Sequence, residues 1–104
     1  MQPFHPIIDS TVSLAVTSST GSVALSKLPS TGRFQLRIHN AGAATIFFNR
    51  GSSTVTAATT NMPIPAGAIE VITIENAQNS PVTHVAAITS SGTATAYFTV
   101  GTGI

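Results

Sequence analysis

The chain has no cysteine and no tryptophan, and it carries very few charged side chains. Without cysteine, disulfides, thiolate metal sites and thiol nucleophiles are excluded. Only 7% of its 104 residues are charged, against about 25% in ordinary globular domains. Serine and threonine, 28 residues together, supply the polarity instead. With 42% hydrophobic residues and a formal net charge of +1, the composition predicts a folded domain and not a disordered chain.

Long apolar runs and targeting signals are missing as well. No stretch approaches the roughly 18 apolar residues that span a bilayer, and the start MQPFHPIIDS lacks the basic residues and apolar run of a signal peptide. We therefore expect a protein made in a cytoplasm, without a membrane partner. The length predicts one domain. The scarcity of charge indicates either a surface buried in an assembly or a Ser/Thr-coated β-protein of ordinary solubility.

β-branched residues are abundant and occur in short runs separated by Gly, Asn and Pro. In the run from Arg33 to His39, apolar Phe34, Leu36 and Ile38 alternate with polar residues, as in a half-buried strand. The same criteria predict about eight strands, at 11–16, 23–25, 33–39, 44–49, 54–57, 68–74, 82–89 and 93–100. We expect an all-β fold, a single antiparallel β-sandwich of jelly-roll or Greek-key type, with a small closed barrel as the alternative.

Two turn signals divide the strands. Residues 40–42 (Asn-Ala-Gly) and 90–92 (Ser-Ser-Gly) each predict a hairpin between the flanking strands. Within the strand at 44–49, Phe47 points away from its neighbours Ile46 and Phe48. This strand is therefore buried on both sides, or Phe47 lies at an interface with a partner.

The N-terminal residues 1–10 are predicted to form an extended arm, and residues 11–104 the β-sandwich domain. Prolines at positions 3 and 6 fix the backbone and remove hydrogen-bond donors, which excludes a central strand. The arm carries the apolar side chains of Phe4, Ile7 and Ile8. They either fold back on their own domain or bind a neighbour, and they are candidate partner-binding residues.

No constellation of residues indicates catalysis, a metal or a cofactor. The carboxylates are Asp9, Glu70 and Glu75 only, and no G-x-S-x-G nucleophile motif occurs. The three histidines lie 34 and 45 residues apart, unlike the close spacing of histidine metal ligands. We expect no enzyme activity and no cofactor.

One polar strand face concentrates basic residues: Arg33 and Arg37, together with Gln35 and His39. Arginine is enriched at protein interfaces because its planar fork binds carboxylates through two hydrogen bonds. Arg33, Arg37 and Phe47 are therefore further candidate partner-binding residues, with a solvated outer face as the alternative. Nucleic acid is not expected as a partner, because the net charge is only +1.

From Arg33 to Gly103 the chain resembles small β-sandwich structural proteins of tailed bacteriophages. The matching motifs are Asn40-x-Gly42, Ile46-Phe47-Phe48-Asn49 with Gly51, Val55-x-Ala57, Ile64-Pro65-Ala66-Gly67 with Glu70, His84-Val85-Ala86-Ala87-Ile88, Ser91-Gly92-Thr93-Ala94 and Thr99-x-Gly101-x-Gly103. They cover about two-thirds of the chain and consist mostly of turn and core residues. The resemblance carries no catalytic or ligand-binding residue.

The resemblance implies a virion protein, most simply a capsid decoration or cementing protein that binds and stabilises the phage head. Its partners would be the major capsid protein or other virion proteins, and we expect a homo-oligomer, with a trimer favoured. A tail, collar or fibre component of the same particle is the first alternative. A carbohydrate- or cell-surface-binding module is the second, although sugar platforms usually use exposed Trp or Tyr and the chain has only Tyr97.

Overall fold

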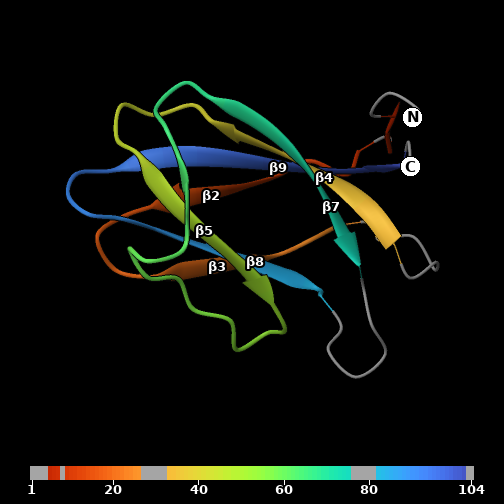
Figure 1. Ribbon diagram of the computed structural model, residues 1–104, viewed down its shortest axis with the longest axis horizontal. Helices are drawn as coiled ribbons and strands as arrows, with labels where there is room; N and C mark the ends of the chain where they lie inside the picture. The colour runs from red at the N-terminus through yellow and green to blue at the C-terminus, as the bar shows by residue number, and fades with distance from the viewer. Residues whose placement is uncertain (1–4, 8, 27–32, 76–81, 103–104) are drawn as a thin grey trace.

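The computed structural model describes residues 5–7, 9–26, 33–75 and 82–102, which form nine strands and no helix. The strands are β1 (His5–Pro6), β2 (Val12–Val16), β3 (Gly21–Ala24), β4 (Arg33–Asn40), β5 (Ile46–Gly51), β6 (Met62–Ile64), β7 (Ile69–Glu75), β8 (His84–Thr89) and β9 (Ala94–Thr102). They build two antiparallel sheets around one core (Figure 1). The predicted all-β, antiparallel, sandwich-like fold is confirmed.

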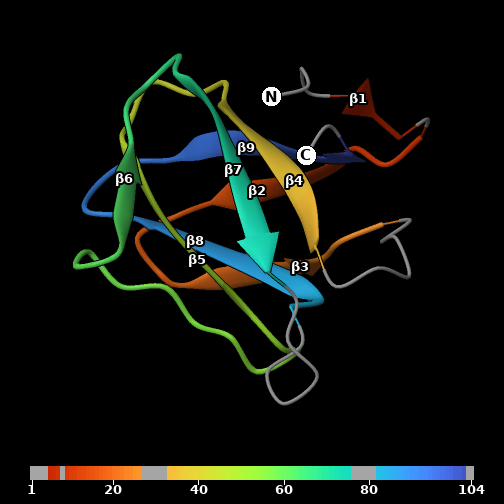
Figure 2. The ribbon, with the colours of Figure 1, turned by 45° about the vertical axis from the view of Figure 1, so that its right-hand side comes forward.

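Sheet A has the order β1-β9-β4-β7, and β2 also pairs with β9, on the same side as β1. Sheet B has the order β3-β8-β5-β6. Figure 2 shows β4 and β7 side by side, with β1 beside the C-terminal end of β9. The long central strands β4 and β9 place most of the core residues of sheet A.

The core forms because alternate residues of each strand point between the sheets. In β4 the even-numbered Phe34, Leu36 and Ile38 are fully buried, whereas Arg33, Gln35, Arg37 and His39 face outward. Phe98 of β9 meets Phe48 of sheet B with ring centroids 5.9 Å apart. Each such side chain stabilises the fold by about 1.5–3 kcal/mol through removal of apolar surface from water. The alternation predicted from the sequence for this strand is confirmed.

The two predicted hairpins are wrong. β4 and β5 flank residues 40–42 but lie in different sheets, and so do β8 and β9, which flank residues 90–92. Turn residues determine that the chain reverses. They do not determine which sheet the next strand joins, because that depends on pairing with strands distant in the sequence. Here the chain crosses from one sheet to the other at both turns.

The strand predicted at 54–57 is also wrong, and the structure has instead β6, within the segment predicted to be a loop. The backbone at 55–57 bonds outside any sheet ladder: Val55 N donates to Ser52 O, and Ala57 N donates to Thr20 Oγ1. β6 contains Pro63, which is tolerated because the strand lies at the edge of sheet B.

The described residues of the N-terminal segment lie on their own domain. β1 pairs with the end of β9, Ile7 N donates to Val100 O at 3.0 Å, and Ile7 packs against the core. A kink at Asp9, with φ of 63°, separates β1 from β2. Ser10, which is fully buried, donates its hydroxyl to the same Val100 carbonyl at 2.9 Å. Of the two expectations for this segment, folding back on the domain holds for residues 5–7 and 9–10.

Candidate interaction surface

The outward face of sheet A is the candidate functional site. Three large hydrophobic side chains are exposed in the part of the chain that the structure describes, and all three lie on this face: Ile69 at 48%, Val71 at 46% and Tyr97 at 39%. We call this region the sheet A surface, and define it by Ile69 and Val71 of β7, Arg37 and His39 of β4, and Tyr97 of β9. Exposed apolar clusters that no other element covers are typical of interaction sites.

Strand register brings these side chains together. His39 lies between its two register partners, Ile69 of β7 and Tyr97 of β9. The His39 and Tyr97 rings are 6.1 Å apart between centroids, with planes inclined by 32°. Two residues before His39 on β4, Arg37 lies between its register partners Val71 and Thr99. His39 is therefore flanked by apolar Ile69 and by Tyr97, and Arg37 by apolar Val71 on one side and Thr99 on the other.

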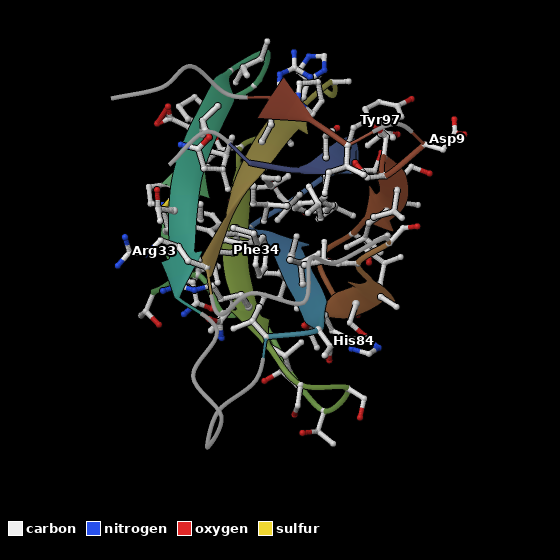
Figure 3. The ribbon with its side chains drawn as sticks, turned by 90° about the vertical axis from the view of Figure 1, so that its right-hand side faces the viewer. Asp9, Arg33, Phe34, His84 and Tyr97 are labelled. Carbon is white, nitrogen blue, oxygen red and sulfur yellow. The ribbon has the colours of Figure 1, made fainter. Side chains whose placement is uncertain are left out.

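The two basic side chains at the centre of the sheet A surface, Arg37 and His39, form no ion pair with a described residue. No hydrogen bond or ion pair joins the side chain of Arg37 or His39 to another described residue. Arg33, at the start of β4, has an interaction partner. Figure 3 shows Arg33 on the outside of the sheet and Phe34 in the interior. The central Arg37 is thus available to a carboxylate of a partner.

Gln35 adds a second polar feature on the same face. It lies between Thr73 and Gly101 in the register, and its side-chain oxygen is buried without a hydrogen-bond partner. A buried acceptor left unpaired costs about 1–3 kcal/mol. This part of the surface therefore carries a local energetic cost in the isolated chain.

The outward face of sheet B differs because its own loop covers part of it. The loop between β5 and β6 is held by Asn49 Nδ2 donating to Thr56 O at 2.9 Å and by the Ala57–Thr20 hydrogen bond at 2.7 Å. As a result Ala57 is 7% exposed, and Ala86 on β8 is fully buried. This face offers less free surface than sheet A does.

The structure brings together some of the predicted partner-binding residues and separates others. Arg33 and Arg37 lie on the outward face of sheet A. Phe47 is half-buried on the opposite sheet, beside Ile88 and Pro63 in the register. Ile7 packs against the core, while Phe4 and Ile8 lie outside the described residues.

The sequence alone did not predict an interaction surface containing Ile69, Val71 and Tyr97. One signal was present for β7: its sequence IEVITIE has apolar residues at both odd and even positions. One set fills the core, so the other set must lie at the surface. No signal of this kind marks Tyr97, because its neighbours on the outward face of β9 are threonines.

The described residues contain no group of three or more His, Cys, Asp or Glu side chains that could hold a metal ion. Within the same residues, no helix is long and apolar enough to cross a bilayer.

Comparison with known proteins finds similarity only among solved structures. No protein-family model matches the chain, and no curated protein matches it. Among solved structures, it is similar to one described as the crystal structure of PirA, at 14% identity and a TM-score of 0.49, covering 90% of this chain and 95% of that one. It is also similar to the Drosophila NLP-core, described in connection with pentamer formation and histone binding, at 11% identity and a TM-score of 0.38, covering 92% and 99%.

Proposed function

We propose that the protein is a virion structural protein of the capsid-decoration type that docks on a protein shell through the sheet A surface. The observation that carries the proposal is the sheet A surface itself, where exposed apolar side chains lie around Arg37, which forms no ion pair with a described residue. In a chain with 7% charged residues, this surface is the strongest feature that could recognise a partner.

We further propose that the fold is a jelly roll. The strand orders β2-β9-β4-β7 and β3-β8-β5-β6 support this. Successive strands from β2 to β9 change sheets at every connection except the one between β5 and β6. Double-sheet jelly rolls occur in viral capsid and lectin domains. The strand order and the resemblance of residues 33–103 to phage structural proteins therefore favour the same class.

The partner expected on chemical grounds is a protein surface with both apolar and acidic side chains. Burial of Ile69, Val71 and Tyr97 would supply the hydrophobic contribution, at about 25 cal/mol for each Å² of apolar surface removed from water. Arg37 would bind a carboxylate through two parallel hydrogen bonds, which fixes orientation as well as adding energy. A shell that repeats such a site would be covered by many copies of the chain.

Binding to purified shells tests this proposal. We expect Tyr97→Ala and Arg37→Ala each to weaken binding by tenfold or more, while Arg50→Ala leaves it unchanged. Arg50 is the matched control, because it is an exposed arginine on β5 of the other sheet. Equal effects of Arg37→Ala and Arg50→Ala would show that binding depends on net charge and not on the sheet A surface.

A tail, collar or fibre component would use the same surface, so its copy number distinguishes it. Quantitative mass spectrometry of purified particles measures that number. A count that matches the capsomers of the shell supports decoration. A count that matches a single ring in the particle supports the tail or collar and contradicts decoration.

One observation favours carbohydrate binding as a second candidate. Tyr97 is exposed at 39% and lies beside the His39 ring, and exposed tyrosines can stack on sugars. Specific binding on a glycan array that disappears with Tyr97→Ala would establish this function. Absence of binding across the array would leave the protein–protein function.

A further inference from the structure

Three of the four sheet edges carry features that prevent pairing with another chain. β6 has three residues, including Pro63, and β3 has four. The edge formed by β1 and β2 contains Pro6 and is interrupted by the kink at Asp9. Short strands, proline and kinks are the devices by which soluble proteins block such edges.

The edge at β7 is neither short nor kinked and has no proline, and its charged residues are Glu70 and Glu75. Its seven residues, Ile69–Glu75, contain no proline, lysine or arginine, and β7 pairs with β4 over their full length. A regular, β-branched edge strand is a template for addition of a further strand.

The hydrogen bonds of β4 show which β7 backbone groups are free. Asn40 N donates to Ala68 O on the β7 side, and Ala41 N donates to Thr95 O on the β9 side. In an antiparallel ladder, hydrogen-bonded pairs recur at every second residue. The even-numbered residues of β7 therefore bond to β4, and the backbone N–H and C=O groups of Ile69, Val71 and Thr73 point away from the sheet.

The free backbone groups and the exposed side chains belong to the same residues. Ile69, Val71 and Thr73 are all exposed, and their backbone groups form no hydrogen bond outside the sheet with another described residue. A strand added at this edge would satisfy their backbone groups and place its own side chains beside theirs on the outward face.

We propose that the added strand is β7 of a second copy of this chain, antiparallel and centred on Val71. In this register Val71 lies opposite its own counterpart, and Ile69 lies opposite Thr73 of the second copy. Each of these pairs exchanges two N–H···O=C hydrogen bonds. Glu70 lies opposite Ile72, so no like charges face each other.

The neighbouring registers are less favourable. Centring the pair on Glu70 places the two Glu70 carboxylates directly opposite, which is destabilising. Centring it on Ile72 places both glutamates opposite isoleucines, Glu75 opposite Ile69 and Glu70 opposite Ile74, whereas the register centred on Val71 does so for Glu70 alone. The charge pattern of the strand thus selects the register centred on Val71, and a second copy supplies the complementary strand without any further partner.

The contact between two β7 strands is small, so the dimer is expected to form only at high protein concentration. A strand pair of this length buries less than the roughly 1,200 Å² at the lower end of specific interfaces, so association should be weak and concentration-dependent. The pairing is isologous and closes at two copies. The trimer expected from the sequence would need a different contact, and it stays a separate prediction.

Amide hydrogen exchange on the free chain, over a range of concentrations, tests the pairing without any virion. The amides of Ile69, Val71 and Thr73 should gain at least tenfold protection as dimers form, while those of Glu70 and Ile72, already bonded to β4, should not change. A chain that remains monomeric at millimolar concentration overturns the proposal. Trimers in which these three amides stay unprotected overturn it as well.

Charge substitution at the centre of the pair tests the register. Val71→Lys and Val71→Glu should each weaken dimerisation at least tenfold, because like charges then lie opposite. An equimolar mixture of the two variants should form heterodimers. Thr95→Lys, exposed on β9 away from this edge, is the control and should dimerise as the natural chain does. Dimers that tolerate both Val71 variants, or a mixture that stays monomeric, overturn the register.

Discussion

The side chain of Asn40, at the end of β4, donates a 2.9 Å hydrogen bond to the carbonyl of Ile64 in the opposite sheet. The same amide nitrogen donates to Ala44 O at 2.8 Å, and its oxygen accepts from Gly42 N at 3.0 Å. Asn40 is fully buried. One side chain thus joins the two sheets and fixes the turn that leads from β4 to β5.

We predict that Asn40→Ala lowers the free energy of unfolding by about 3 kcal/mol, because it leaves the buried Ile64 carbonyl and the partly buried Ala44 carbonyl and Gly42 amide without these partners, at about 1–3 kcal/mol each. Urea denaturation followed by circular dichroism measures the change. Asn49→Ala is the control: it removes one exposed hydrogen bond, to Thr56 O, and should cost about 1 kcal/mol or less. Similar losses for the two variants would contradict the role of Asn40.

Two glycines in this region are required for different reasons. A Cβ on Gly42 would lie 2.5 Å from the Cα of Ala94, so the constraint there is close approach of two backbones. Gly67 has φ of 77° and open space around its Cβ position, so its constraint is the left-handed conformation, which Asn adopts more readily than other residues.

We therefore predict that Gly67→Asn is nearly neutral, whereas Gly67→Ala costs about 1–2 kcal/mol. Gly42→Ala and Gly42→Asn should both cost about 1–3 kcal/mol or more, since either side chain displaces β9. Midpoints of urea denaturation for the four variants check this. A stable Gly42→Asn protein would show that the approach to Ala94 relaxes easily.

The sequence predicted the faces of strands better than their partners. Alternation in Arg33–His39 identified both the buried and the outward residues, because period-2 patterning is local. The sequence also predicts the turn at 40–42, but it predicts a hairpin there, and β4 and β5 lie in different sheets. Nothing local to that turn specifies that Asn40 bonds to Ile64, 24 residues away.

The candidate site was predicted only in part, because sequence patterns show the faces of a strand but not its pairing partners. Arg37 was found from the polar face of its own strand. Ile69 and Tyr97 became neighbours of His39 only through the pairing of β4 with β7 and β9, which the sequence did not reveal. The apolar character of Ile7 predicts partner binding and is equally compatible with the core position that it occupies.

Removal of the Gln35 amide is expected to stabilise the fold. Its buried oxygen has no partner, so Gln35→Met, which keeps the shape and removes the amide, should raise the free energy of unfolding by about 1 kcal/mol. Thermal and urea unfolding both measure this. Gln35→Ala separates the two contributions, since it removes the amide together with the packing of the side chain. A Gln35→Met protein less stable than the natural one would indicate that the amide has a favourable contact.

The N-terminal segment is expected to stabilise its own domain. Removal of residues 1–8 deletes β1, the Ile7 contact with the core and the Ile7–Val100 hydrogen bond. Loss of a partly buried isoleucine and an edge pairing should cost about 2 kcal/mol. For a domain of this size, each kcal/mol lowers the melting temperature by about 4–8 °C, so scanning calorimetry should show a fall of roughly 10 °C in the isolated chain. An unchanged melting temperature with reduced binding to shells would show instead that the segment acts on a neighbour, since a strand that stabilises its own sheet cannot be removed without a thermal effect.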